Sequence, residues 1–102
     1  MAEYVKIATL DRLHEKKGTL VSVEGLDIVL FRRKENVYAM NNVCAHQHLS
    51  MLHKGPVNEY EVTCPMHGWT YDMRTGNSTT GQGKVSSYTV KVVENDVFIA
   101  LQ

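Results

Sequence analysis

The sequence predicts an all-β fold, an antiparallel sandwich or barrel into which a small metal-binding lobe is inserted. Short segments rich in β-branched residues alternate with turn residues along much of the 102-residue chain, which is the pattern of hairpins. No stretch has the periodicity of a long helix. The two cysteines lie at positions 44 and 64, and each is followed closely by a histidine. The functional site is therefore expected between residues 44 and 71.

The N-terminal half reads as one strand, a charged connection and a set of hairpins. The first strand is predicted over residues 4–8, and residues 9–17 are expected to include one helical turn capped by Thr9 or Asp11. Gly18 is expected to end the connection. Hairpin strands, with turns at residues 24–25 and 34–36, are then predicted over residues 19–23, 26–33 and 37–40.

The C-terminal part is predicted to form a last hairpin. Its strands are expected over residues 84–93 and 97–101, with a turn around Asn95. Tyr88, Val90 and Val92 alternate along the first of these strands, so they should face the same side of the sheet. The preceding residues 75–83 are polar and glycine-rich, which predicts a surface loop.

Length and charge limit the possible functions. A chain of 102 residues predicts a single domain, residues 1–102, with the metal-binding lobe at about residues 42–72. Eleven basic and eleven acidic residues leave no basic excess for nucleic acid or an anionic membrane surface. The chain shows neither a signal peptide nor an apolar run of membrane-spanning length, and its cysteines are assigned to metal rather than to a disulfide. We therefore expect a soluble, cytoplasmic protein.

Two Cys/His pairs carry the functional prediction: Cys44-Ala-His46 and Cys64-Pro-Met-His67. Strand-like residues 60–62 lie between the pairs, so two loops at the ends of neighbouring strands can meet face to face. Together they offer two thiolates and two imidazoles to a metal. Ligand type alone leaves zinc open, and a zinc-stabilised interaction module remains an alternative. Each loop supplies one thiolate and one imidazole, however, which is unusual for structural zinc.

These residues resemble a known signature. Cys44-Ala-His46, followed by Cys64-Pro-Met-His67-Gly68-Trp69, is similar to the signature of soluble Rieske-type ferredoxins, and the turn at residues 72–76 is similar as well. The resemblance covers nearly the whole chain. It implies one Rieske [2Fe-2S] cluster bound by Cys44 and Cys64 on one iron and by His46 and His67 on the other.

The resemblance also implies how the centre works. Two ferric ions, two sulfides and two thiolates with neutral imidazoles sum to zero charge, so an electron is accepted more easily than by a cluster with four thiolates. Rieske centres accordingly span about −150 to +300 mV, against about −400 mV for plant-type ferredoxins. In the family the ligand histidines bind iron through Nδ1, which makes His46 and His67 the expected electron port.

Several positions place the chain among low-potential members. High-potential relatives have a disulfide at positions that match Leu49 and Met66, and a serine donor where this chain has Trp69. Tyr71 matches a tyrosine whose hydroxyl donates to a cluster cysteine sulfur. In place of a proline-bearing third loop the chain has Gly81-Gln82-Gly83, and His48 and His53 are expected to be solvated loop residues.

The predicted function is electron transfer and not catalysis. By resemblance, the protein passes single electrons from an NAD(P)H-dependent flavin reductase to a terminal oxygenase, most often an aromatic-ring dioxygenase. We do not expect, in these 102 residues, the large domain with a histidine- and carboxylate-bound iron that such an oxygenase adds. The alternative within the family is the Rieske small subunit of an NAD(P)H nitrite reductase-like enzyme.

Overall fold

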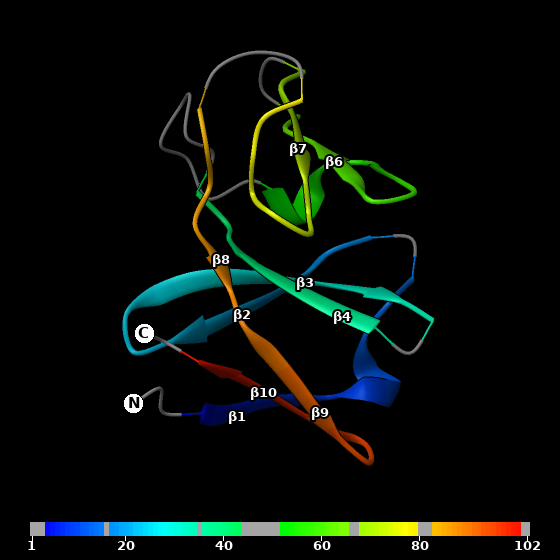
Figure 1. Ribbon diagram of the computed structural model, residues 1–102, viewed down its shortest axis with the longest axis vertical. Helices are drawn as coiled ribbons and strands as arrows, with labels where there is room; N and C mark the ends of the chain where they lie inside the picture. Colours follow the sequence, from blue (N-terminus) through cyan, green and yellow to red (C-terminus); the bar gives the residue numbers. More distant parts are fainter. Residues whose placement is uncertain are drawn as a thin grey trace.

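In the computed structural model, the protein is built from three antiparallel sheets, with the smallest of them at one end of the long axis (Figure 1). The structure describes residues 4–15, 17–34, 36–43, 52–65, 68–79 and 83–100. The sheets have the orders β1-β10-β9, β2-β3-β4-β8 and β5-β6-β7.

The base sheet contains both ends of the described chain: β1 (Tyr4–Thr9), β9 (Val90–Val93) and β10 (Asp96–Ala100). The helical turn predicted after β1 is present as the 3-10 helix η1 (Leu10–Arg12). Thr9 does not cap it through its side chain. Instead, Asn95 from the β9–β10 turn accepts hydrogen bonds from the backbone N–H groups of Leu10, at 2.8 Å, and Asp11, at 3.2 Å. The capping role predicted for Thr9 or Asp11 is thus taken by a residue that is distant in the sequence.

The central sheet confirms the predicted hairpins: β2 (Thr19–Val23), β3 (Leu26–Arg33), β4 (Asn36–Asn41) and the short β8 (Ser87–Tyr88). Glu24 and Gly25 both have positive φ, 47° and 82°, at the β2–β3 turn. Such turns match the right-handed twist of the strands they join.

The single strand predicted over residues 84–93 is wrong in two respects. Strand structure begins only at Ser87, since Lys84 forms an isolated bridge with Asn77 and residues 85–86 belong to no strand. The chain is interrupted at Thr89, so that β8 pairs with β4 and β9 pairs with β10. This segment therefore passes from the central sheet to the base sheet. Side-chain alternation cannot detect the change, because Tyr88, Val90 and Val92 still pack against one apolar cluster, as predicted.

The small sheet contains β5 (Val57–Asn58), β6 (Glu61–Thr63) and β7 (Thr70–Asp72), preceded by the 3-10 helix η2 (Leu52–Lys54). A turn from Asp72 to Gly76 then leads to isolated bridges that pair Tyr71 with Ser78 and Asn77 with Lys84. This sheet lies above the central sheet in Figure 1.

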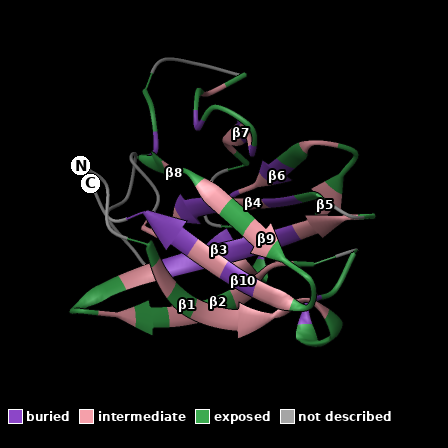
Figure 2. Ribbon diagram, turned by 60° about the horizontal axis from the view of Figure 1, so that its bottom comes forward, coloured by how far each residue is buried: buried purple, intermediate pink, exposed green. Residues whose placement is uncertain are grey.

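Strand β3 separates two apolar clusters, because its side chains alternate between the faces of the central sheet. Val29 and Phe31 belong to the cluster shared with the small sheet, whereas Ile28 and Leu30 belong to the cluster shared with the base sheet. All four are buried, and they form the purple middle of β3 in Figure 2. The clusters therefore join all three sheets through one strand.

The all-β fold class predicted from the sequence is confirmed, with antiparallel sheets and only two short 3-10 helices in the described residues. No helix among these residues has the length and apolar character needed to cross a membrane.

Candidate metal centre

One of the four predicted ligands, Cys64, lies in the part of the chain that the structure describes. Cys64 directly follows β6, and it is 1% exposed. Cys44, His46 and His67 lie outside the described residues. The structure therefore shows Cys64 and the residues that flank the other three predicted ligands in sequence.

The second Cys/His loop is closed at its base by a pair of backbone hydrogen bonds. The N–H of Cys64 donates to the carbonyl oxygen of Trp69 at 2.7 Å, and the N–H of Gly68 donates back to the carbonyl of Cys64 at 3.0 Å. Gly68 has a φ of 75°, a conformation that residues with a β-carbon seldom adopt. These bonds hold Cys64 next to Gly68 and Trp69, which stand on either side of position 67 in the sequence.

The first Cys/His loop also has its two ends held together. The N–H of Leu52 donates to the carbonyl of Asn42 at 3.2 Å, across the segment that carries Cys44 and His46 in sequence. Just before that segment, the side-chain oxygen of Asn41 accepts from the N–H of Val43 at 2.8 Å. The loop therefore leaves β4 in a fixed direction and returns at η2.

The two loops have a common foundation. Leu52, at the end of the first loop, and Cys64, at the start of the second, lie in the same buried cluster as Val62. Gly55 brings the backbones still closer, because a β-carbon built there would lie 1.9 Å from the carbonyl oxygen of Thr63. The described ends of both loops thus meet at one place, which fits a centre that takes ligands from both.

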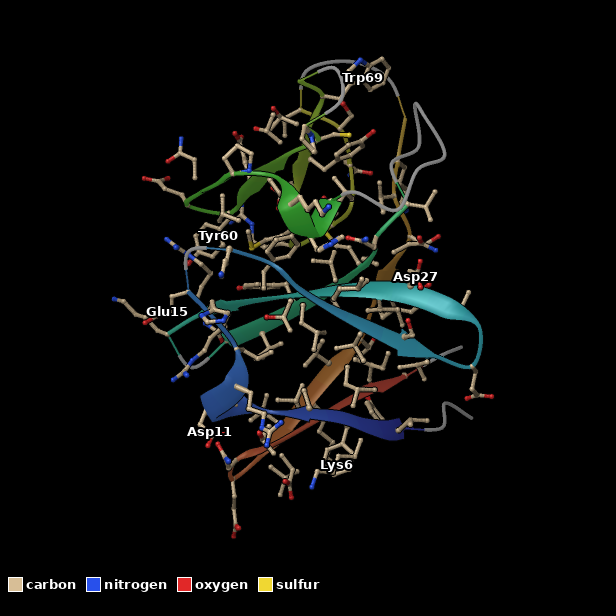
Figure 3. All side chains as sticks on the ribbon, turned by 180° about the vertical axis from the view of Figure 1, so that it is seen from behind. Lys6, Asp11, Glu15, Asp27, Tyr60 and Trp69 are labelled. Carbon is tan, nitrogen blue, oxygen red and sulfur yellow. The ribbon has the colours of Figure 1, made fainter. Side chains whose placement is uncertain are left out.

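Two residues predicted to surround the cluster are placed beside Cys64. Tyr71 is fully buried in the same apolar cluster, opposite Val62 in the β6–β7 pair. Trp69 is half-buried, packs against that cluster and lies at the far tip of the molecule in Figure 3. An indole N–H can only donate a hydrogen bond.

One ion pair lies at the end of β7, between Asp72 and Arg74. The Arg74 side chain bonds the Asp72 carboxylate through Nε at 3.1 Å and Nη2 at 2.9 Å, and these bonds lower the pKa of Asp72 below its ordinary value of 3.8. The guanidinium also lies over the Tyr60 ring, 4.5 Å from the centroid. This arrangement holds the turn after β7 against the turn between β5 and β6.

Sequence reasoning missed one polar contact at this site. His53, expected to be a solvated loop residue, is half-buried and bonds the side chain of Asn42. The two residues are eleven positions apart in the sequence, and no periodic pattern of side chains links them. No sequence signal therefore pointed to the contact. The predictions for His48, Leu49, Met66, Gly81 and Gln82 fall outside the described residues.

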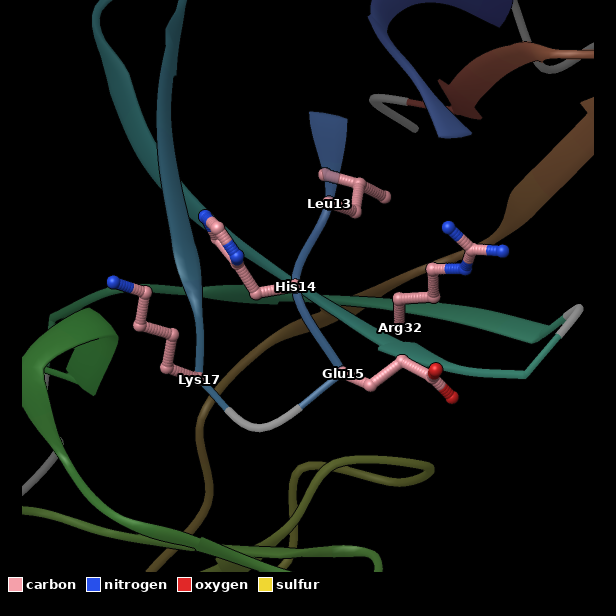
Figure 4. A pocket seen from close by; sticks show the side chains of 5 residues that line it. All are labelled: Leu13, His14, Glu15, Lys17 and Arg32. Atoms are coloured by element: carbon pink, nitrogen blue, oxygen red, sulfur yellow. The ribbon is translucent and has the colours of Figure 1, made fainter. Parts of the chain in front are cut away.

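A separate hollow of about 440 Å³ lies beside the connection that follows η1 (Figure 4). None of its lining residues comes from the small sheet, so it is distinct from the metal centre. Its lining mixes both charges and an apolar side chain: Leu13, His14, Glu15, Lys17 and Arg32.

Comparison with known proteins agrees with this geometry. The family model described as the Rieske [2Fe-2S] domain matches residues 3–99. A ferredoxin component of the naphthalene 1,2-dioxygenase/salicylate 5-hydroxylase systems from Ralstonia sp. is 28% identical over 101 residues, which cover 97% of this chain and 96% of the relative.

Solved structures give the same result. The ferredoxin of carbazole 1,9a-dioxygenase from Nocardioides aromaticivorans IC177 is 30% identical, with a TM-score of 0.91 over 99% of this chain and 100% of that one. A Mycobacterium tuberculosis protein described as an NADH-dependent nitrite reductase small subunit shares the fold, with a TM-score of 0.91 at 20% identity over 100% of this chain and 97% of its own. From the match over nearly its full length, we conclude that the chain belongs to the Rieske [2Fe-2S] domain family and has one cluster of the Rieske type.

Proposed function

We propose that this protein is the one-electron carrier of a multicomponent oxygenase system, located in the cytoplasm. It would receive electrons from an NAD(P)H-dependent flavin reductase and deliver them to a terminal oxygenase. The observation that carries this proposal is the likeness, over nearly the whole length of both chains, to ferredoxin components of dioxygenase systems. A free-standing carrier of this size has no need of a catalytic residue of its own.

We propose Cys44, His46, Cys64 and His67 as the cluster ligands. The burial of Cys64 and the closed loop from Cys64 to Trp69 support the second pair. The hydrogen bond that joins Asn42 to Leu52 supports the first pair, because it holds both ends of the loop next to the cluster of side chains around Cys64. When bound by two thiolates and two imidazoles, the cluster accepts and returns one electron.

We also propose that residues 1–102 form one Rieske domain with a cluster-binding lobe at about residues 42–72. The packing of Cys64 and Val29 in one apolar cluster supports this organisation, since it ties the lobe to the central sheet. The lobe positions the ligands, while the burial of Cys64 limits the access of water to its sulfur.

Visible and EPR spectra of the purified protein, recorded before and after reduction by dithionite, test the assignment. A red-brown protein that bleaches reversibly and gains the EPR signal of a reduced Rieske centre is expected. A colourless protein that contains zinc would contradict the ligand assignment, because zinc has no redox chemistry and no visible spectrum with these ligands.

The nitrite reductase small subunit is the second candidate, favoured by the fold match to the mycobacterial protein. Purification from the native host distinguishes the two. A carrier of the proposed kind is expected to elute alone at its own mass of 11.5 kDa. Stable co-elution with a large flavin-containing subunit would favour the nitrite reductase assignment.

A further inference from the structure

Asn42 is a buried polar residue at the point where the chain leaves β4 toward Cys44. Its side chain is 0% exposed, and it is the one polar residue classed as buried within the described part of the chain. Burying an amide is costly unless its hydrogen bonds are made. Its presence therefore points to a specific contact.

That contact is made with His53, on the far side of the loop that carries Cys44 and His46. The Asn42 side-chain oxygen accepts a hydrogen bond from the His53 backbone N–H at 2.6 Å. The Asn42 side-chain nitrogen lies 2.8 Å from Nδ1 of the His53 ring. Together with the backbone bond from Leu52 to Asn42, three hydrogen bonds join the two ends of the loop.

The donors in this contact fix the state of the His53 ring. A backbone N–H can only donate, so the side-chain oxygen of Asn42 must face it. The amide NH₂ of Asn42 then faces the ring, and because that group can only donate, Nδ1 must be the acceptor. The bond requires a neutral His53 ring with its proton on Nε2. The His53 ring thus accepts a hydrogen bond from the Asn42 side chain and has a defined tautomer.

The contact is also anchored to the central sheet. The backbone N–H of Asn42 donates to the carbonyl of Asp27 at 2.8 Å, at the start of β3. On the other side, Gly55 packs the turn after η2 against the end of β6, directly before Cys64. A shift of Asn42 or His53 would therefore alter the distance between the two Cys/His loops.

We propose that Asn42 and His53 form a latch that positions the first ligand loop, and that this latch sets how tightly the cluster is held. The inference rests on the proposed ligands Cys44 and His46, which this loop carries. Both latch residues act through the loop and are positioning residues rather than ligands. Partners outside the ligand set commonly change metal affinity by about 10- to 100-fold when they are removed.

The test measures how fast the cluster is lost to an iron chelator, followed by visible absorbance, together with the EPR g-values of the reduced protein. In Asn42→Ala and His53→Leu, loss should be about 10- to 100-fold faster than in the wild type, with shifted g-values. His53→Asn places an amide oxygen near the former Nδ1 and should restore a rate close to that of the wild type. If Asn42→Ala does not fold, the two His53 variants decide the question.

Val97→Ala is the matched control. Val97 is fully buried in the other apolar cluster, below the central sheet, so its truncation should lower the free energy of unfolding without touching the latch. The latch would be overturned if His53→Leu lost its cluster at the wild-type rate. It would also be overturned if Val97→Ala, at the same loss of free energy of unfolding, lost its cluster as fast as the latch variants do. A wild-type protein without a Rieske spectrum would overturn the ligand assignment and the latch with it.

Discussion

Gly55 lies so close to the carbonyl oxygen of Thr63 that a β-carbon at position 55 would be 1.9 Å from it. Gly55 ends the turn after η2, where its N–H donates to Leu52, and Thr63 immediately precedes Cys64. This close approach holds the first ligand loop against the second. Only glycine permits it, because every other residue has a β-carbon.

Gly55→Ala is therefore expected to push η2 away from β6. The free energy of unfolding should fall by about 1–3 kcal/mol, as in other overpacked sites, and the iron content of the purified protein should fall as well. Thermal unfolding and iron analysis measure the two effects. Wild-type stability with full iron content would show that the two backbones can separate at no cost.

Gly25→Ala is the control for this prediction. Gly25 has a φ of 82°, but a β-carbon there would have no heavy atom within 4 Å, so a side chain at this position is strained without a clash. The expected cost is about 1–2 kcal/mol. Since Gly25 lies in the turn between β2 and β3 of the central sheet, the iron content of the Gly25→Ala protein should equal that of the wild type.

Cys64→Ser is expected to abolish the visible and EPR spectra of the Rieske centre and to lower the unfolding temperature, because metal binding contributes to folding. Val62→Ala is a suitable comparison. It removes buried volume two residues away, which costs stability, but it leaves the ligands intact and should keep the spectrum. An unchanged Rieske spectrum in Cys64→Ser would refute the assignment of this thiol.

Tyr71→Phe is expected to lower the reduction potential by some tens of millivolts, where about 59 mV is a tenfold change in a one-electron equilibrium. The reason is that a hydroxyl donating to a ligand sulfur stabilises the more electron-rich reduced state. Protein-film voltammetry measures the shift. Tyr38→Phe, which alters a ring packed edge-on against Tyr60 at 5.9 Å, should leave the potential unchanged. An equal potential in both variants would make Tyr71 a packing residue only.

Asp72→Asn is expected to reduce stability at neutral pH and to have little effect in acid. Arg74 lowers the pKa of Asp72 in the folded protein, so the ion pair contributes fully above the ordinary value of 3.8 and is lost as pH falls through the lower folded value. A partly exposed pair of this kind contributes about 0.2–1 kcal/mol. Urea unfolding of both proteins at pH 7 and near pH 3 measures the difference.

A gap between wild type and Asp72→Asn that stays constant from pH 7 to pH 3 would contradict this account. Asp96→Asn is the comparison, because its partner Lys6 forms a more exposed pair on the base sheet, with side-chain exposures of 52% and 44%. A smaller effect is expected there.

The hairpins of the central sheet were predictable because their information is local. Glu24 and Gly25 form a turn whose positive φ values suit a glycine, and the strands on either side alternate in the expected way. The Cys/His pairs were equally visible, since ligand type and spacing are properties of short segments. Cys64 directly follows β6 and is buried, and its role as a ligand remains a prediction.

Other features depend on contacts between residues far apart in sequence. Asn95 replaces Thr9 as the partner of η1 from more than eighty positions away, and no local pattern predicts that choice. The interruption at Thr89 follows from a competition between β4 and β10 for the same segment. The contact of Asn42 with His53 arises only when the loop is closed.

The pairing of β4 with β8 has a consequence beyond stability. Ala39 lies opposite Tyr88 and Met40 opposite Ser87, so the chain departs for the small sheet and returns from it on two adjoining strands. Because the two ends of the segment between β4 and β8 are already paired, this segment can be lengthened, shortened or exchanged at little entropic cost to the rest of the fold. This holds provided that the packing of the segment against Val29 and Phe31 of the central sheet is kept.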